Sequence, residues 1–164
     1  MNTTDLAPPI SLPTGLHWSS TRQDPATLWI TGPSGAAVLS VGSAARSALT
    51  SAGRQVTLLE GELDRGDVDH AEHARRAADA AATLVDDGVI AIVVIDSPRV
   101  RDRELARLAH EARDLPFFEI FVNTLPGARA SASPANVYEV PPLPDLVVFP
   151  GPVVAAVASV IALV

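Results

Sequence analysis

The segment VIAIVVID, residues 89–96, constrains the fold of this chain more than any other feature. It places seven apolar residues in a row before its aspartate, with no alternation of polar and apolar side chains. A strand of this kind is buried on both faces, which is typical of a parallel sheet covered by helices on each side. The segment therefore predicts an α/β fold with a central parallel sheet.

The rest of the chain supplies the elements that such a sheet needs. Four further apolar segments are expected to be strands, at residues 27–31, 55–59, 117–123 and 145–149. Helical patterns lie between them: one ends before Gly53, an alanine-rich one stops near Gly88, one covers 101–113, and the last begins at Pro152. Strands alternating with helices predict a three-layer open parallel sheet of five strands with right-handed crossovers. The helix over 101–113 is expected to be amphipathic, with its apolar face formed by Leu105, Leu108 and Ala109.

Composition limits the classes of function. With 164 residues and 48% hydrophobic content, we expect one domain, residues 26–164, preceded by an irregular proline-containing arm, residues 1–25. The formal net charge of −7 disfavours nucleic-acid and membrane-surface binding. The sequence has no cysteine, and we therefore expect a cytoplasmic protein. The apolar stretch at the C-terminal end is too short to span a bilayer, so this stretch is expected to be a core helix. All 12 basic residues are arginine.

The segment WITGPSGAAVLS, residues 29–40, partly matches the phosphate-binding loop GxxxxGK[ST]. In that loop backbone N–H groups surround the phosphates, the lysine reaches the β and γ oxygens, and the hydroxyl binds magnesium. Here Ala37, Val38 and Leu39 replace the second glycine, the lysine and the hydroxyl residue. The remaining candidates for binding a small anion are Gly32, Ser34, Gly35 and Ser40.

Several segments in order resemble the adenylylsulfate (APS) kinase family. ATLWITGPSG is similar to the family's TLWxTGxSGxGKST, LLEGELDR to LLDGDxxR, AEHARR to ENxRR, DSPRVRDR to ISPxxxDR, FFEIFVNT to FxEVFVDTP, and VYEVPPLPDLVV to PYExPxxPxLxL. The resemblance covers the chain from Thr27 onward. It implies a P-loop NTPase/kinase-like fold and a homodimer that transfers the γ-phosphate of ATP to the 3′-hydroxyl of APS with Mg²⁺.

The resemblance also assigns site residues. Arg65 and Arg75 match arginines of the family's APS-binding region, Ser97 matches the serine of ISPxxxDR, and Glu60 and Glu62 stand at the aspartates of DGD. His73 replaces the asparagine of ENxRR, and the family's RDxKGLY lid segment is absent between Asn123 and Tyr138. Since phosphoryl transfer depends on positioning and charge stabilisation, these changes together predict loss of most of the catalysis.

Other polar groups have two interpretations each. Asp96 follows a buried strand, where it could hold magnesium or serve as a loop or cap residue. His70 and His73 have a zinc-compatible spacing but no evident third ligand, so no metal site is predicted. Four arginines on the helix over 101–113 and just before it could form an anion patch or be solvated: Arg99, Arg101, Arg103 and Arg107. Gly32, Glu60, Asp96 and Asn123 should meet at the carboxyl edge of the sheet, where such folds bind ligands.

Three hypotheses follow for the function. The first is a catalytically impaired APS kinase-like protein that acts as a binding or interaction module linked to sulfate activation, with APS or another small anion, a second copy or a partner enzyme as its partners. The alternative is an APS kinase-type phosphotransferase, or another APS- or nucleotide-acting enzyme with an altered site; only then are ATP and Mg²⁺ expected as cofactors. The third is a structural dimer, in which Val38 and Leu39 would both be buried in apolar surroundings.

Overall fold

The computed structural model describes residues 24–61, 69–124, 138–149 and 151–164. Its centre is a sheet of five strands: β1 (Thr27–Thr31), β2 (Val56–Glu60), β3 (Ile90–Val94), β4 (Phe117–Val122) and β5 (Leu146–Val148). Their order is β2-β3-β1-β4-β5, and every pairing is parallel. The predicted five-stranded parallel α/β sheet is therefore confirmed, with β3 and β5 shorter than the sequence indicated.

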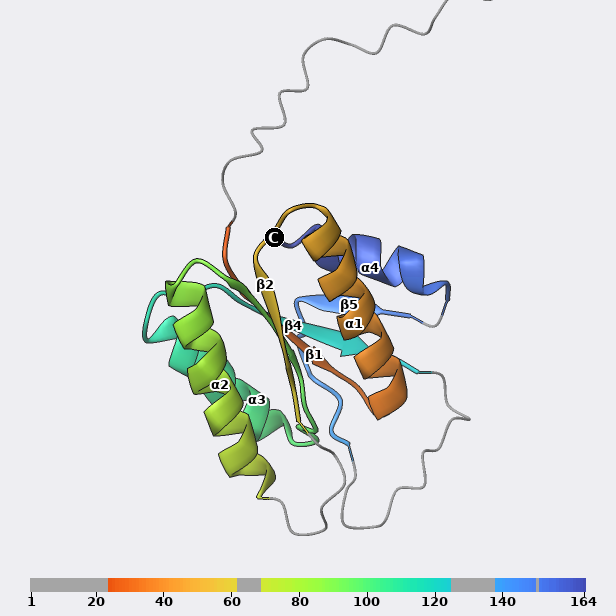
Figure 1. Ribbon diagram of the computed structural model, residues 1–164. Coiled ribbons are helices and arrows are strands. Elements are labelled where there is room, and N and C mark those ends of the chain that lie inside the picture. The colour runs from red at the N-terminus through yellow and green to blue at the C-terminus, as the bar shows by residue number, and fades with distance from the viewer. Residues whose placement is uncertain (1–23, 62–68, 125–137, 150) are drawn as a thin grey trace, which may run out of the picture.

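Four helices cover the sheet in two layers. They are α1 (Gly35–Ser51), α2 (His70–Asp86), α3 (Val100–Glu111) and α4 (Val153–Ile161). Figure 1 shows α1 and α4 on one face of the sheet and α2 and α3 on the other. The predicted ends of the first two helices are confirmed, since Gly53 and Gly88 follow the cap residues with φ of 77° and 81°, a conformation that favours glycine.

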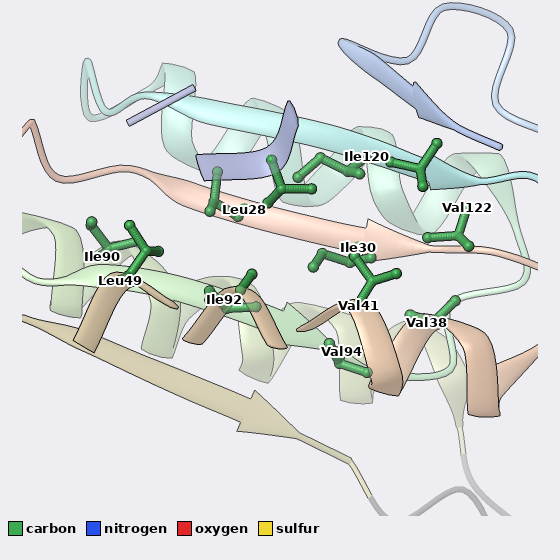
Figure 2. Packing of buried hydrophobic residues seen from close by; sticks show 13 residues of the cluster. Leu28, Ile30, Val38, Val41, Leu49, Ile90, Ile92, Val94, Ile120 and Val122 are labelled. Atoms are coloured by element: carbon green, nitrogen blue, oxygen red, sulfur yellow. The ribbon is translucent and has the colours of Figure 1, made fainter. Parts of the chain in front are cut away.

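The two faces of the sheet are packed in different ways. On the α1 side, branched aliphatic side chains of β1, β3 and β4 meet Val38, Val41 and Leu49 of α1 (Figure 2). On the α2 side, the helix contributes mainly alanines to the core. The largest side chain packed against them is Trp29 of β1, which is fully buried. Small helix residues let α2 and α3 approach the sheet and each other closely.

The prediction for the face of α3 was wrong. Leu105 and Leu108 are 52% and 56% exposed, while Arg103 and His110 are turned toward the sheet and buried. The cause is that both polar side chains find partners below them: Arg103 pairs with Glu119, and His110 bonds to Thr27. Paired polar groups can occupy a buried face that leucine was expected to fill.

The apolar C-terminal stretch forms the helix α4, but only part of this helix is buried in the core. Val157 and Val160 of α4 are buried, whereas Val154 is 79% exposed. The arm expected at residues 1–25 falls almost wholly outside the described residues, so the domain boundary stays a prediction. Within the described ranges, no helix combines the length and apolar character needed to traverse a bilayer.

Candidate functional site

The carboxyl edge of the sheet collects the side chains that the sequence placed there. Glu60 ends β2 and lies level with Val94 of β3, and Thr31 at the end of β1 lies level with Phe121 of β4. Gly32 and Asn123 directly follow β1 and β4, and Asp96 comes two residues after the end of β3. The Asn123 amide donates to the Val148 carbonyl at 2.8 Å, which ties the end of β4 to the edge strand β5.

A tight turn joins β1 to α1 at this edge. Only three residues separate the two elements, and a Cβ on Gly32 would lie 2.6 Å from the Val122 carbonyl oxygen. Ser34 caps α1, its hydroxyl accepting from the Ala37 amide at 3.4 Å and its carbonyl from the Val38 amide at 3.0 Å. The predicted glycine turn and helix N-terminus are thus present, an arrangement that favours a small anion.

The two residues that replace lysine and hydroxyl have different environments. Val38 is 4% exposed and belongs to the aliphatic core, with its Cγ2 3.1 Å from where a Cβ of Gly32 would stand (Figure 2). Leu39 is 39% exposed. The interpretation in which both are buried is therefore wrong for Leu39, because position 39 of the helix faces outward while position 38 faces the sheet. Ser40 is also exposed.

These residues do not fit magnesium-bound ATP in the way that the phosphate-loop motif requires. Val38 brings methyl groups into the core beneath the turn, and Leu39 offers no oxygen ligand. Within the described residues, no three His, Asp, Glu or Cys side chains are grouped so that they could hold a metal ion. What the turn retains is the positive end of a helix dipole and its amide groups.

A histidine and a carboxylate meet at the end of β3. His70 Nδ1 lies 3.8 Å from Asp96 Oδ2, too far for a hydrogen bond, and this nitrogen is buried without a partner among the described residues. The His73 ring packs against Gly61, where a Cβ would be 2.5 Å from Cε1. Asp96 thus lies in the loop between β3 and α3 and faces a residue of α2, and its role stays a prediction.

Arg75 is engaged along its own helix. Its guanidinium donates to both oxygens of Glu72 at 2.8 Å and to Asp79 at 2.9 Å. The hydrogen bond from Arg75, followed by that from Arg76, lowers the pKa of Glu72 to about 2, and the same pairing raises the pKa of Arg75. Arg75 is exposed, so it stands on the helix surface with its charge already balanced. Arg65 and Glu62 lie outside the described residues.

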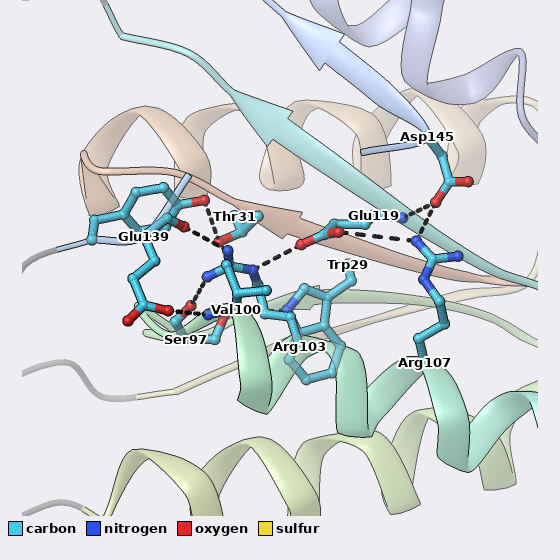
Figure 3. Close-up of polar contacts among 10 residues, drawn as sticks. Trp29, Thr31, Ser97, Val100, Arg103, Arg107, Glu119, Glu139 and Asp145 are labelled. Carbon is cyan, nitrogen blue, oxygen red and sulfur yellow. Dashed lines mark hydrogen bonds and ion pairs between the residues drawn. The ribbon is translucent and has the colours of Figure 1, made fainter. Parts of the chain in front are cut away.

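The main polar network of the site centres on Arg103, which is 2% exposed. Figure 3 shows its guanidinium between three acceptors: Nε donates to Glu119 Oε1 at 2.8 Å, and the two terminal nitrogens donate to the carbonyls of Ser97 and Glu139 at 2.6 Å. The Ser97 hydroxyl accepts from the Trp29 indole at 3.2 Å. Ser97 therefore serves the buried network and is not presented to solvent.

The segment 138–145 is attached to the sheet and to α3 by hydrogen bonds of the same network. The Tyr138 hydroxyl lies 3.0 Å from the hydroxyl of Thr31, the residue before Gly32, and the Tyr138 ring stacks on Phe121 with centroids 6.0 Å apart. Burial raises the pKa of Tyr138. Further along, Asp145 accepts from Arg107 at 2.6 Å and from the Glu119 amide at 2.7 Å (Figure 3).

Sequence reasoning missed this network. It treated Arg103 and Arg107 as an anion patch or as solvated groups, whereas both are used within the fold, Arg103 completely and Arg107 through Asp145. Arg99 and Arg101 are exposed, as a solvated face would be. The available signal was Glu119 inside the apolar strand 117–122, because a charge in a buried strand requires a partner.

Comparison with known proteins places these features in a family. The family model described as adenylylsulphate kinase matches residues 24–151. An adenylyl-sulfate kinase from Pseudomonas aeruginosa is 37% identical over 116 residues, which are 63% of this chain and 56% of the relative; the chain thus spans about half the length of that protein.

Solved structures agree with this match. The Mycobacterium tuberculosis APS kinase CysC in complex with AMPPNP and APS has a TM-score of 0.74 and 27% identity, covering 85% of this chain and 97% of its own. A hexameric APS kinase from Thiobacillus denitrificans has a TM-score of 0.68 and 26% identity, covering 85% of this chain and 29% of its own. The fold is therefore the one seen in these APS kinase structures.

Proposed function

This chain belongs to the adenylylsulphate kinase family, and from that premise we propose that it is a catalytically impaired member that acts as a binding or interaction module linked to sulfate activation. The observation that carries the proposal is Val38. It stands where the motif has its lysine, and it is buried in the aliphatic core under the Gly32 turn. No lysine occurs elsewhere in the chain to take over that charge.

Charge supports the same conclusion. A transferring phosphoryl group needs cations at its oxygens, and the family's reaction depends almost entirely on positioning and charge stabilisation. Two arginines of α3 are already neutralised, Arg103 by Glu119 and Arg107 by Asp145. Removing one group that stabilises the charge of a transition state typically costs about 3 to 4 kcal/mol. Loss of both the lysine and the metal-binding hydroxyl therefore removes at least several kcal/mol of transition-state stabilisation.

The direct test is ATP-dependent phosphorylation of APS by the pure protein in a coupled assay with Mg²⁺. We expect a rate at the background of protein-free controls, while the P. aeruginosa relative assayed in parallel serves as the active standard. A rate well above background would overturn the proposal.

A pair of variants separates a missing charge from a remodelled turn. Val38→Lys with Leu39→Ser restores the motif residues, and Leu39→Ser alone is the matched control, since Leu39 is exposed and Val38 is not. We expect the double variant to lose stability and to give no ATP heat in calorimetry, because its lysine has to leave a buried position. Gain of ATP binding would instead indicate that the turn still has the geometry of a phosphate cradle.

A second candidate is an APS- or nucleotide-acting enzyme with an altered site, and the pairing of His70 with Asp96 favours it. An imidazole beside a carboxylate is a common proton-transfer arrangement. Titration of the protein with APS, followed by phosphorus NMR of mixtures with APS and ATP, tests this candidate. Absence of both binding heat and turnover would remove it.

The assembly state is also a proposal. A hexameric relative exists in T. denitrificans, and we propose that this chain forms a homodimer or associates with a partner enzyme. Sedimentation velocity on the pure protein tests self-association. A concentration-independent monomer would leave the partner enzyme as the surviving version.

A further inference from the structure

A groove opens between α2 and α3 on the outer side of the helical layer. Its volume is about 380 Å³, and its apolar lining includes Ala78, Leu105, Ala106 and Ala109. Figure 1 shows the two helices lying side by side. The alanines among the lining residues leave an apolar surface between the charged side chains. We call this the α2–α3 groove; its volume is in the range of small-molecule sites.

Most of the charges that line the groove are already satisfied. Glu72 and Asp79 pair with Arg75 at 2.8 and 2.9 Å. Asp69 caps α2, with its Oδ1 accepting from the Ala71 and Glu72 amides at 3.1 and 3.4 Å. These three carboxylates therefore have partners within their own helix.

Asp102 is the exception. It lines the groove from the first turn of α3, is 5% exposed, and its Oδ2 is buried with no hydrogen-bond partner among the described residues. The positive end of α3 favours an anion there. A buried carboxylate oxygen without a donor is costly, so a cation that reaches it gains more than it would at the surface. The neighbouring Arg103 does not neutralise it, since its donors go to Glu119, Ser97 and Glu139.

We propose that the α2–α3 groove binds an organic monocation, with an ammonium, guanidinium or amidinium group on a compact apolar body. The cation pairs with Asp102, and the apolar body rests on the alanines of the two helices. Leu105, at 52% exposure, is the side chain with room to move aside and admit the ligand. The site uses none of the residues of the Gly32 turn, and its only residue in common with the proposed function is Arg75, which lines the rim and is paired with Glu72 and Asp79.

The test compares two probes of the same shape on the unaltered protein. Benzamidine carries an amidinium on a phenyl ring, and benzamide is its neutral counterpart. In nitrogen-proton NMR titrations, benzamidine should shift the amides of Leu105, Ala106 and Ala109 saturably, and benzamide should bind at least about tenfold more weakly. Equal binding of the two probes, or shifts that avoid the groove, would overturn the proposal.

Two variants then locate the charge. Asp102→Asn should weaken benzamidine binding about tenfold or more, whereas Asp79→Asn, which removes the same charge from the rim, should change it less than about threefold. Equal effects of both variants would mean that general electrostatics acts in place of a specific pair, and would contradict the proposal. If Asp102→Asn does not fold, the probe comparison on the unaltered protein still decides the question.

Discussion

Buried polar side chains connect segments of this molecule that are far apart in the sequence. Arg103 and Glu119 are both buried, and their ion pair at 2.8 Å is completed by two backbone carbonyls that accept from the same guanidinium. Removing one member of a buried ion pair leaves the other charge uncompensated. Arg103 therefore holds three segments together: the β3–α3 connection at Ser97, strand β4 at Glu119, and the segment that begins at Tyr138.

Replacing Arg103 with methionine should destabilise the protein by about 3 to 5 kcal/mol, because Glu119 then remains as a buried charge without its partner. Urea unfolding followed by circular dichroism measures this. Arg101→Met is the matched control on the same helix; Arg101 is exposed, so its loss should change the unfolding free energy by under about 0.5 kcal/mol. The double variant Arg103→Met, Glu119→Gln should recover part of the loss. A cost near that of the control would show that the pair contributes little.

His110 makes stability depend on pH. It is fully buried, with Nδ1 donating to the Ala106 carbonyl and Nε2 accepting from the Thr27 hydroxyl, both at 2.8 Å. Burial lowers its pKa below the usual 6.5. Between the folded and unfolded pKa values the unfolded chain binds more protons, so stability is complete above about pH 6.5 and falls as the pH drops below it.

The slope of this loss should approach at most about 1.4 kcal/mol per pH unit for one proton. Urea unfolding at a series of pH values between 8 and 5 (about the range in which histidine titrates) measures it, and His110→Gln should flatten the acid side of the profile. His73→Gln, which leaves His110 in place, is the control and should keep the slope. A His110→Gln profile parallel to that of the unaltered protein would contradict the assignment.

At the scale of elements, the local sequence pattern predicted the buried strand β3 and the ends of the first two helices. The apolar run at 89–96 identified a buried parallel strand, and β3 is buried at every position. Glycines with positive φ after α1 and α2 gave those helix ends. The turn at Gly32 was also predicted from the sequence, because an apolar strand followed by glycine and a helical pattern is a local signature. The capping role of Ser34 came only from the structure.

The face of α3 and the polar network could not be predicted in this way. Arg103 meets Glu119, which is 16 residues away, and His110 meets Thr27, which is 83 residues away. A hydrophobic pattern assigns leucine to the buried face unless the partners of the polar residues are known, and those partners are set by strand order. The same limit explains the site: the position of Val38 in the motif was readable, but its burial under Gly32 depends on contacts with β1, β3 and β4.

For the whole molecule, the order of the strands implies a gradient of stability. β3 and β1 lie inside the sheet and are buried at every residue, whereas β5 is a three-residue edge strand and α4 buries only Val157 and Val160. Segments with few buried contacts open locally, while central strands exchange only when the whole domain unfolds.

Hydrogen exchange followed by mass spectrometry should therefore show the slowest exchange in peptides covering 90–94 and the fastest among the sheet and its helices in peptides covering 146–161. Ile92→Val sharpens the test. Ile92 is fully buried in β3, and losing one methylene there should cost about 1 kcal/mol of global stability. That loss should speed exchange of the β3 peptides about fivefold and leave the α4 peptides unchanged, because their amides exchange through local opening. Equal acceleration of both regions would mean that the edge strand and α4 unfold together with the centre, as one cooperative unit.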